Sequence, residues 1–119
     1  MEHNSDFRYD LKLGVIGEEY LASILQNKKI EVKTDFKALK TGNVFVEYSS
    51  RSKKSGISTT EAIWYAFILS NNLICLIKTD ELKMLCRKYI GTNRDIKGGD
   101  SNTSKGIILP IKDLFWKKN

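Results

Sequence analysis

Residues 43–49, with the sequence NVFVEYS, restrict the fold more than any other segment of this chain. Side chains of a β-strand alternate between two faces, which here places Val44 and Val46 on one face and Phe45 and Glu47 on the other. A strand that is apolar on both faces is buried on both, so the segment predicts a central strand of a covered sheet. Glu47 is then a carboxylate in largely apolar surroundings, which is rare without a partner or a metal ion.

The rest of the chain predicts an α/β fold in one domain covering residues 1–119. Apolar residues that recur at three- and four-residue steps indicate an amphipathic helix over 10–26, with Asp10 as N-cap. Alternation indicates a strand over 29–36, followed by a basic turn. The composition is that of an ordinary globular domain, with 41% hydrophobic and 29% charged residues.

The second half begins with Ser58-Thr59-Thr60-Glu61, which has the pattern of a capping box and predicts a helix over 58–69. This assigns Glu61 to capping rather than to catalysis. The remaining patterns predict a strand at 73–78, a helix from 79, a mobile loop at 91–105, a last strand at 106–111, and flexible tails at 1–9 and 113–119. Pro110 makes this last strand an edge strand or marks its end.

The charge of the chain points to an anionic partner. Twenty Lys and Arg against fourteen Asp and Glu give a formal net charge of +6, typical of nucleic-acid binding, although solubility alone is the alternative. The single histidine, His3, nearly excludes His-ligated zinc and His-dependent nucleophilic catalysis. No apolar run reaches membrane-spanning length and no signal-peptide pattern is found, so we expect a cytoplasmic protein without a membrane partner.

Carboxylates must therefore supply any chemistry. Metal-dependent hydrolysis of a phosphodiester needs acidic side chains that hold hard divalent cations such as Mg²⁺. The candidates are Glu18 at the edge of the first helix's apolar face, Asp35 at the end of the first strand, and Glu47. Taken alone, Glu18 is more often a solvated carboxylate, and Asp35 is as often a turn residue.

The order helix-Glu, strand-Asp, strand-Glu, with the segments GEEYLASIL, KIEVKTD, TGNVFVEYSS and SGISTTEA, resembles the PD-(D/E)XK nuclease superfamily over residues 10–80. Within that superfamily it looks like small phage nucleases related to Holliday-junction resolvases. The resemblance implies a restriction-endonuclease-like αβββαβ core, with a central mixed sheet flanked by helices. It also implies Mg²⁺ or Mn²⁺ held by Asp35 and Glu47 with help from Glu18, and cleavage of DNA, with a preference for junctions or branches. A homodimer is expected because symmetric cutting of two strands needs two related sites.

Two departures from the family pattern affect the site. The motif lysine is expected at position 49, which is Ser49, and Lys33 on the same strand face as Asp35 is the predicted substitute. Only two strands precede the predicted helix where the family has three, which leaves open Glu31-Val32-Lys33 as the motif triplet.

Basic residues beside the two acid-bearing strands are the predicted contacts to DNA phosphates. An inactive DNA-binding module that retains the nuclease fold is the alternative function, and a structural protein with incidental charge is a third. The phosphate contacts predicted from the sequence are Lys37, Lys40, Arg51, Lys53 and Lys54.

Overall fold

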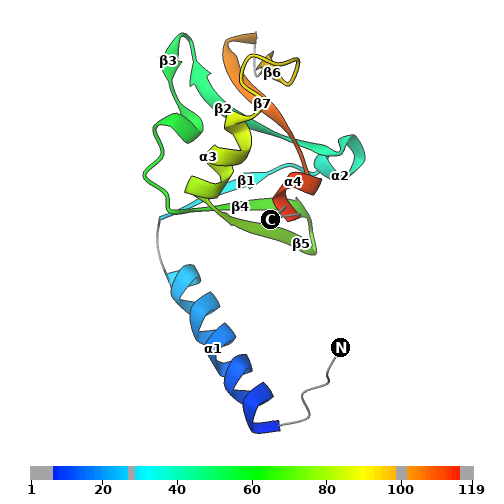
Figure 1. Cartoon of the computed structure of the whole chain (residues 1–119). Coiled ribbons are helices and arrows are strands. Elements are labelled where there is room, and N and C mark those ends of the chain that lie inside the picture. The colour runs from blue at the N-terminus through cyan, green and yellow to red at the C-terminus, as the bar shows by residue number, and fades with distance from the viewer. Residues whose placement is uncertain (1–6, 27–28, 99–101, 116–119) are drawn as a thin grey trace.

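The computed structural model describes residues 7–26, 29–98 and 102–115 and has the predicted α/β class (Figure 1). Seven strands form two sheets rather than the single central sheet that was expected. The elements are α1 (Phe7–Gln26), β1 (Ile30–Thr34), α2 (Ala38–Thr41), β2 (Asn43–Ser50), β3 (Lys53–Lys54), the 3₁₀ helix η1 (Gly56–Ser58), β4 (Trp64–Ser70), β5 (Leu73–Lys78), α3 (Thr79–Arg87), β6 (Asp95–Gly98), β7 (Ser104–Pro110) and α4 (Lys112–Phe115).

The first sheet has the order β1-β4-β5 and is mixed. β1 runs parallel to β4, with Glu31 opposite Tyr65 and Lys33 opposite Phe67, and β4 runs antiparallel to β5. Tyr65 and Phe67 are almost fully buried. Because paired residues of neighbouring strands point to the same face, Glu31 and Lys33 lie on the inner face of this sheet.

The second sheet has the order β3-β2-β7-β6 and is antiparallel throughout. β2 pairs with β7 along its whole length, with Glu47 opposite Gly106, so the prediction of an interior strand at 43–49 is confirmed. Pro110 allowed two positions for 106–111. The edge position is wrong, because β7 lies between β2 and β6, whereas the prediction that Pro110 marks the end of the strand is confirmed. Pro110 is tolerated there as the last residue of the strand.

One hydrophobic core joins the two sheets to α3. Burying a single large apolar side chain of this kind contributes roughly 1.5–3 kcal/mol. Cys75 and Cys86 are free cysteines within the core. The most completely buried side chains are Tyr65, Phe67, Leu69, Leu82, Ile107, Leu109 and Val44.

The helix predicted over residues 58–69 is not formed, and this is the main correction to the sequence analysis. The apolar part of the segment is strand β4, whose neighbours β1 and β5 cover both of its edges. A short run that is apolar on all sides fits a buried strand as well as a buried helix, so periodicity could not separate them. The capping-box residues instead form a turn, in which the Thr60 hydroxyl accepts a hydrogen bond from the Ala62 N–H at 3.1 Å.

Helix α1 extends away from the body of the protein (Figure 1). It begins at Phe7, so Asp10 lies in its first turn and is not the N-cap. Ile24 is buried and the Tyr20 ring meets the Trp64 ring edge-on at 6.4 Å, but the apolar residues Leu13 and Ile16 are about half exposed. The radius of gyration of 17.1 Å exceeds the roughly 13–14 Å of a compact chain of this length.

The outer face of the first sheet is also apolar and open. Val32 of β1 is 53% exposed and Ile74 of β5 is 60% exposed, and both lie on the face opposite Tyr65 and Phe67. Together with the exposed stripe of α1, this gives the chain two apolar surfaces that no described residue covers. Such surfaces commonly mark interaction sites.

The predicted tails and mobile loop contain regular structure. Residues 7–9 belong to α1 and 113–115 to α4, and β6 lies within the predicted loop 91–105. His3 and the outer parts of both tails are outside the described residues.

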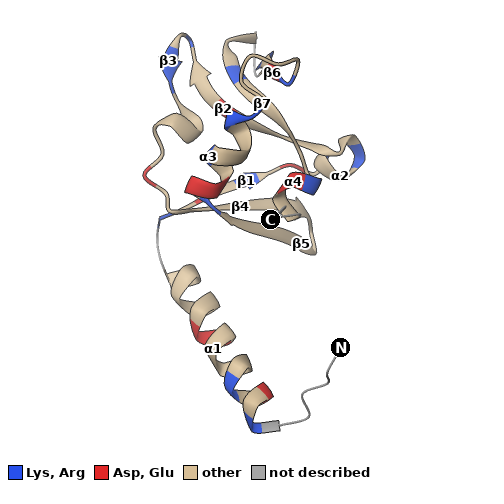
Figure 2. Ribbon diagram, viewed as in Figure 1, with Lys and Arg blue, Asp and Glu red and all other residues tan. Residues whose placement is uncertain are grey.

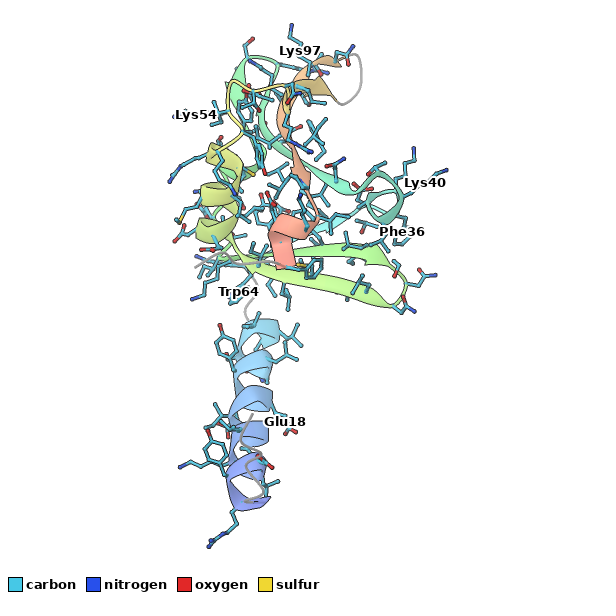
Figure 3. The ribbon with its side chains drawn as sticks, turned by 45° about the vertical axis from the view of Figure 1, so that its right-hand side comes forward. Glu18, Phe36, Lys40, Lys54, Trp64 and Lys97 are labelled. Carbon is cyan, nitrogen blue, oxygen red and sulfur yellow. The ribbon has the colours of Figure 1, made fainter. Side chains whose placement is uncertain are left out.

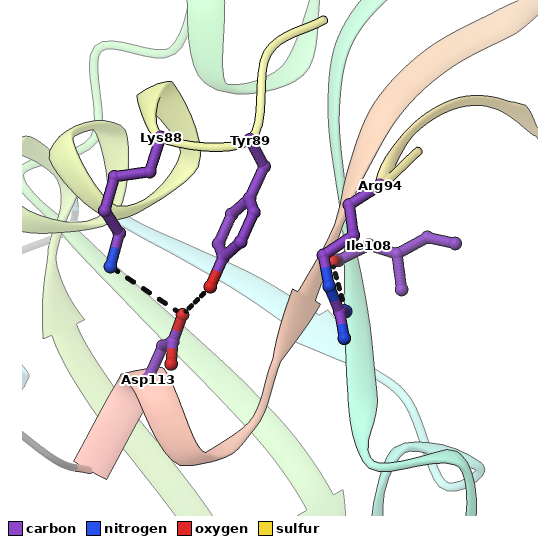
Figure 4. A network of polar contacts seen from close by, with 5 residues as sticks. All are labelled: Lys88, Tyr89, Arg94, Ile108 and Asp113. Carbon is purple, nitrogen blue, oxygen red and sulfur yellow. Dashed lines mark hydrogen bonds and ion pairs between the residues drawn. The ribbon is translucent and has the colours of Figure 1, made fainter. Parts of the chain in front are cut away.

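Polar contacts join the C-terminal part of the chain to the body. Near the end of α3, the Tyr89 hydroxyl donates a hydrogen bond to the Asp113 carboxylate, which also forms an ion pair with Lys88 (Figure 4). Arg94 donates hydrogen bonds to the Asn43 side chain and to the Ile108 carbonyl.

Asp95 has a lowered pKa, which predicts a pH-dependent contribution to stability. Burial alone would raise this pKa, but hydrogen bonds from the Tyr48 hydroxyl (2.6 Å) and the Gly91 N–H (2.9 Å), with Lys105 nearby, outweigh it. Asp95→Asn is expected to lower the free energy of unfolding by about 1 kcal/mol at pH 7. Because the folded-state pKa is lowered, the ionised carboxylate contributes its full stabilisation of the fold above pH 3.8, the usual pKa of Asp. This stabilisation is lost as the pH falls through the folded-state pKa.

Urea unfolding of the wild type and Asp95→Asn from pH 7 down to pH 3 measures this difference. The two curves should converge at the acid end. Tyr48→Phe removes the donor of the same hydrogen bond and should likewise weaken the dependence of the free energy of unfolding on pH. A difference that stays constant with pH would contradict the assignment.

Candidate functional site

Asp35 directly follows β1, and its backbone and its side chain each form a hydrogen bond with a backbone group. Its N–H donates to the Ile68 carbonyl at 2.9 Å, and its Oδ1 accepts a hydrogen bond from the Lys37 N–H at 3.0 Å. This is the usual role of Asp in a turn. The contact fixes the chain where it leaves the first sheet for α2.

Glu18 lies midway along α1 and is exposed (Figure 3). Within residues 7–26, 29–98 and 102–115, no group of three or more His, Cys, Asp or Glu side chains is placed to hold a metal ion. The structure therefore does not assemble the predicted trio of Glu18, Asp35 and Glu47.

Glu47 and Lys33 do come together. They line one narrow pocket of about 10 Å³ between the two sheets, which is roughly the space of one water molecule. Glu47 is half-buried, and its Oε2 accepts a hydrogen bond from the Ser55 Oγ at 2.9 Å. We call this space the Glu47 pocket, and its lining residues are Lys33, Phe45, Val46, Glu47, Gly56, Tyr65 and Phe67.

Tyr65, a lining residue of the Glu47 pocket, is affected by a second carboxylate, Glu31. Burial and, after it, the charge of Glu31, with smaller contributions from Cys86 and Glu47, together raise the pKa of Tyr65 to about 12, against the opposite effect of a hydrogen bond with Thr60. Both carboxylates therefore act on the same buried hydroxyl. Glu31 is opposite Tyr65 in the β1–β4 register, and Lys33 and Glu47 line the pocket with Tyr65, so we group Glu31, Lys33 and Glu47 as one cluster around Tyr65, although Glu31 does not itself line the pocket.

Gly56 forms a wall of the Glu47 pocket that only glycine can provide. It has a φ of +52°, and a Cβ atom added there would lie 2.3 Å from the Glu47 carbonyl oxygen. The backbone of η1 therefore packs directly against the strand that carries Glu47. Sequence reasoning did not find this contact, because nothing in the pattern relates position 56 to position 47.

Glu47 is the one carboxylate that lines the Glu47 pocket, and Glu31 lies on the neighbouring strand opposite Tyr65. Mg²⁺ in proteins is commonly held by one or two carboxylates, with water and substrate phosphates completing its octahedron. Of this cluster, Glu47 and Lys33 were predicted from the sequence, and Glu31 only as part of an alternative triplet.

The predicted DNA-binding residues occupy two places rather than one. Lys37 and Lys40 lie at α2, where β2 begins, whereas Arg51, Lys53 and Lys54 lie at the β2–β3 turn, where it ends (Figures 2 and 3). The seven residue steps of β2 separate the two groups by roughly 24 Å. All five are exposed.

The β2–β3 turn has a defined shape. Arg51 and Ser52 have φ values of 51° and 65°, as expected for the two central residues of a tight hairpin, and the Arg51 N–H donates to the Thr103 carbonyl at 2.8 Å. The basic side chains of this turn are therefore presented from an ordered backbone.

Two further findings complete the description. Among the described residues, no helix has both the length and the apolar character needed to span a membrane. Comparison of the chain with protein-family models, curated proteins and solved structures found no match.

Proposed function

We propose that this protein is a metal-dependent endonuclease that hydrolyses DNA phosphodiester bonds at the Glu47 pocket. The observation that supports this function best is the shared location of Glu47 and Lys33, with Glu31 acting on the same Tyr65 hydroxyl as Glu47. Two carboxylates and a lysine are the side chains that metal-dependent phosphodiester cleavage needs. The proposal keeps two of the residues expected from the nuclease resemblance and adds Glu31 in place of Asp35.

Each residue of the cluster has a role in this mechanism. The Glu31 and Glu47 carboxylates would hold the divalent cation, and the Ser55 hydroxyl fixes the orientation of Glu47 through its hydrogen bond. The Lys33 ammonium group would offset the negative charge that grows on the phosphate as the bond to the leaving oxygen breaks. A bound Mg²⁺ or Mn²⁺ supplies Lewis acidity and lowers the pKa of water.

The two basic groups at the ends of β2 support DNA as the substrate. A separation of roughly 24 Å corresponds to about seven phosphates along one strand at 3.4 Å each, so both groups can contact the same duplex. Phosphate contacts of this kind carry no sequence preference. We propose branched or junction DNA in a bacterial or phage-infected cytoplasm, following the nuclease resemblance.

A DNA-binding module without activity is the second candidate. It is favoured by Ser49 at the position of the motif lysine, and by the separation of Asp35 from the Glu47 pocket. This alternative predicts salt-sensitive DNA binding that EDTA does not change.

Cleavage of a labelled four-way junction, linear duplex and single strand in Mg²⁺, Mn²⁺ or EDTA separates the two candidates. The nuclease proposal predicts cutting in the presence of metal and intact DNA in EDTA. DNA that is retarded but uncut under all conditions would support the inactive binding module. An absence of both binding and cutting at low salt would contradict both candidates.

We also propose a homodimer in which a second copy covers the apolar stripe of α1. The support is the half-exposed Leu13 and Ile16 and the open outer face of the first sheet. Light scattering after size exclusion should give twice the 13.6 kDa chain mass for the wild type and the single mass for Ile16→Asp. Glu18→Gln, at the edge of the apolar face and on the side of the helix away from Ile16, should remain dimeric, and a monomeric wild type would contradict the proposal.

A further inference from the structure

A second and larger pocket lies on the other side of β2 from the Glu47 pocket. Its volume is about 290 Å³, which is close to the lower limit of roughly 300 Å³ for small-molecule sites. We call it the cationic pocket. Its rim carries Lys54, Lys83 and Arg87, and its floor contains Val46, Ile57 and Ile107.

The positive charge of the rim is not neutralised by the protein. No acidic residue lines the pocket, and among the described residues none of the three rim cations forms an ion pair with a carboxylate. Lys54 comes from β3, whereas Lys83 and Arg87 are one helical turn apart on α3 and point to the same side. Three cations converging from two elements favour an anionic group at the mouth.

The apolar floor of the pocket favours a ligand in which a flat apolar ring system is attached to that anionic group. Val46, Ile57 and Ile107 are buried apolar side chains. The ring of Tyr48 also lines the pocket, and its hydroxyl is held by the hydrogen bond to Asp95. Aromatic and apolar side chains beside cations are the usual surroundings of an unpaired base and its phosphate.

We propose that the cationic pocket binds a single nucleotide, with the base on the apolar floor and the phosphate between the rim cations. The volume admits one nucleotide and is too small for two. Free nucleotide and an unpaired nucleotide of a DNA strand share this chemistry. The pocket therefore adds a recognition site that is separate from the Glu47 pocket.

The position of the pocket connects it to the proposed nuclease site. Val46 lines both pockets, and consecutive residues of η1 face them, with Gly56 at the Glu47 pocket and Ile57 and Ser58 at the cationic pocket. An unpaired nucleotide held here would lie next to the phosphate that is cut. This last step rests on the proposed function, and it explains a preference for branched DNA, which offers unpaired nucleotides at its branch points.

The test is titration of the full chain with dAMP and with a short single-stranded oligonucleotide, followed by calorimetry. Binding to Lys83→Gln/Arg87→Gln should be at least about 10-fold weaker than to the wild type, because the double variant loses two of the three rim charges that would face the phosphate. Lys97→Gln, which removes an exposed cation on β6, is the matched control and should bind as the wild type does. Circular dichroism melting confirms that each variant is folded.

The outcomes separate the sources of the nucleotide and the two proposals. Binding of dAMP that depends on Lys83 and Arg87 supports a site for free or strand-borne nucleotide. Binding of the oligonucleotide alone, with the same dependence, supports a site for a nucleotide within a strand. Absence of both, or binding that the double variant leaves unchanged, overturns the pocket assignment. Nucleotide binding without DNA cleavage would remove the nuclease function and leave the pocket.

Discussion

Glu47→Gln is expected to reduce the rate of metal-dependent DNA cleavage by at least about 100-fold. The substitution removes the one carboxylate that lines the Glu47 pocket, and stabilisation by the cation amounts to several kcal/mol, each 1.36 kcal/mol of which is tenfold in rate. The Gln carbonyl can still accept the hydrogen bond from the Ser55 Oγ, so the fold should persist. Single-turnover cleavage of a labelled junction measures the effect.

A matched control is Glu61→Gln, which removes a carboxylate from an exposed turn residue. It should cut at the wild-type rate. Equal rates for Glu47→Gln and the wild type would exclude Glu47 from the reaction, whereas equal losses in both variants would indicate a general effect of charge.

Gly56→Ala is expected to lower the free energy of unfolding by about 3 kcal/mol and to reduce cleavage. The new Cβ would lie 2.3 Å from the Glu47 carbonyl oxygen, so β2 and η1 must separate. The φ of +52° adds the strain of a left-handed conformation, roughly 1–2 kcal/mol for a residue with a Cβ. For a domain of this size the melting temperature should fall by about 10 °C.

Gly42→Ala distinguishes the cost of backbone strain from the cost of a steric clash of the new Cβ atom. Gly42 also has a positive φ, +79°, but a Cβ added there has no atom within 4 Å. It should cost only the conformational strain, so its melting temperature should fall by about half as much and its cleavage should be unchanged. Equal effects of the two substitutions would contradict the close packing of η1 on Glu47.

The sequence predicted most of the individual elements but not their assembly. Local periodicity predicted the strands β1, β2 and β5 and the helices α1 and α3, because the spacing of apolar residues can be read from the sequence itself. Strand β4 was predicted as a helix because its burial by β1 and β5 is a tertiary property that periodicity does not encode.

The same distinction applies to the candidate site. Glu47 was recognisable as the one charge in an apolar strand, and Lys33 as a lysine on the same strand face as Asp35 and Glu31. That the charge of Glu31 acts on Tyr65, a lining residue of the Glu47 pocket, depends on the parallel pairing of β1 with β4. Such long-range pairing could not be read from the spacing of the acids.

Binding of Mn²⁺ to the wild type and to Glu31→Gln, Glu47→Gln and Asp35→Asn, followed by the paramagnetic resonance signal of the free ion, tests whether Glu31 and Glu47 hold the metal ion. We expect Glu31→Gln and Glu47→Gln to bind Mn²⁺ much more weakly than the wild type, whereas Asp35→Asn should bind it normally. Weakened binding in Asp35→Asn together with normal binding in Glu31→Gln would exclude this pair of ligands.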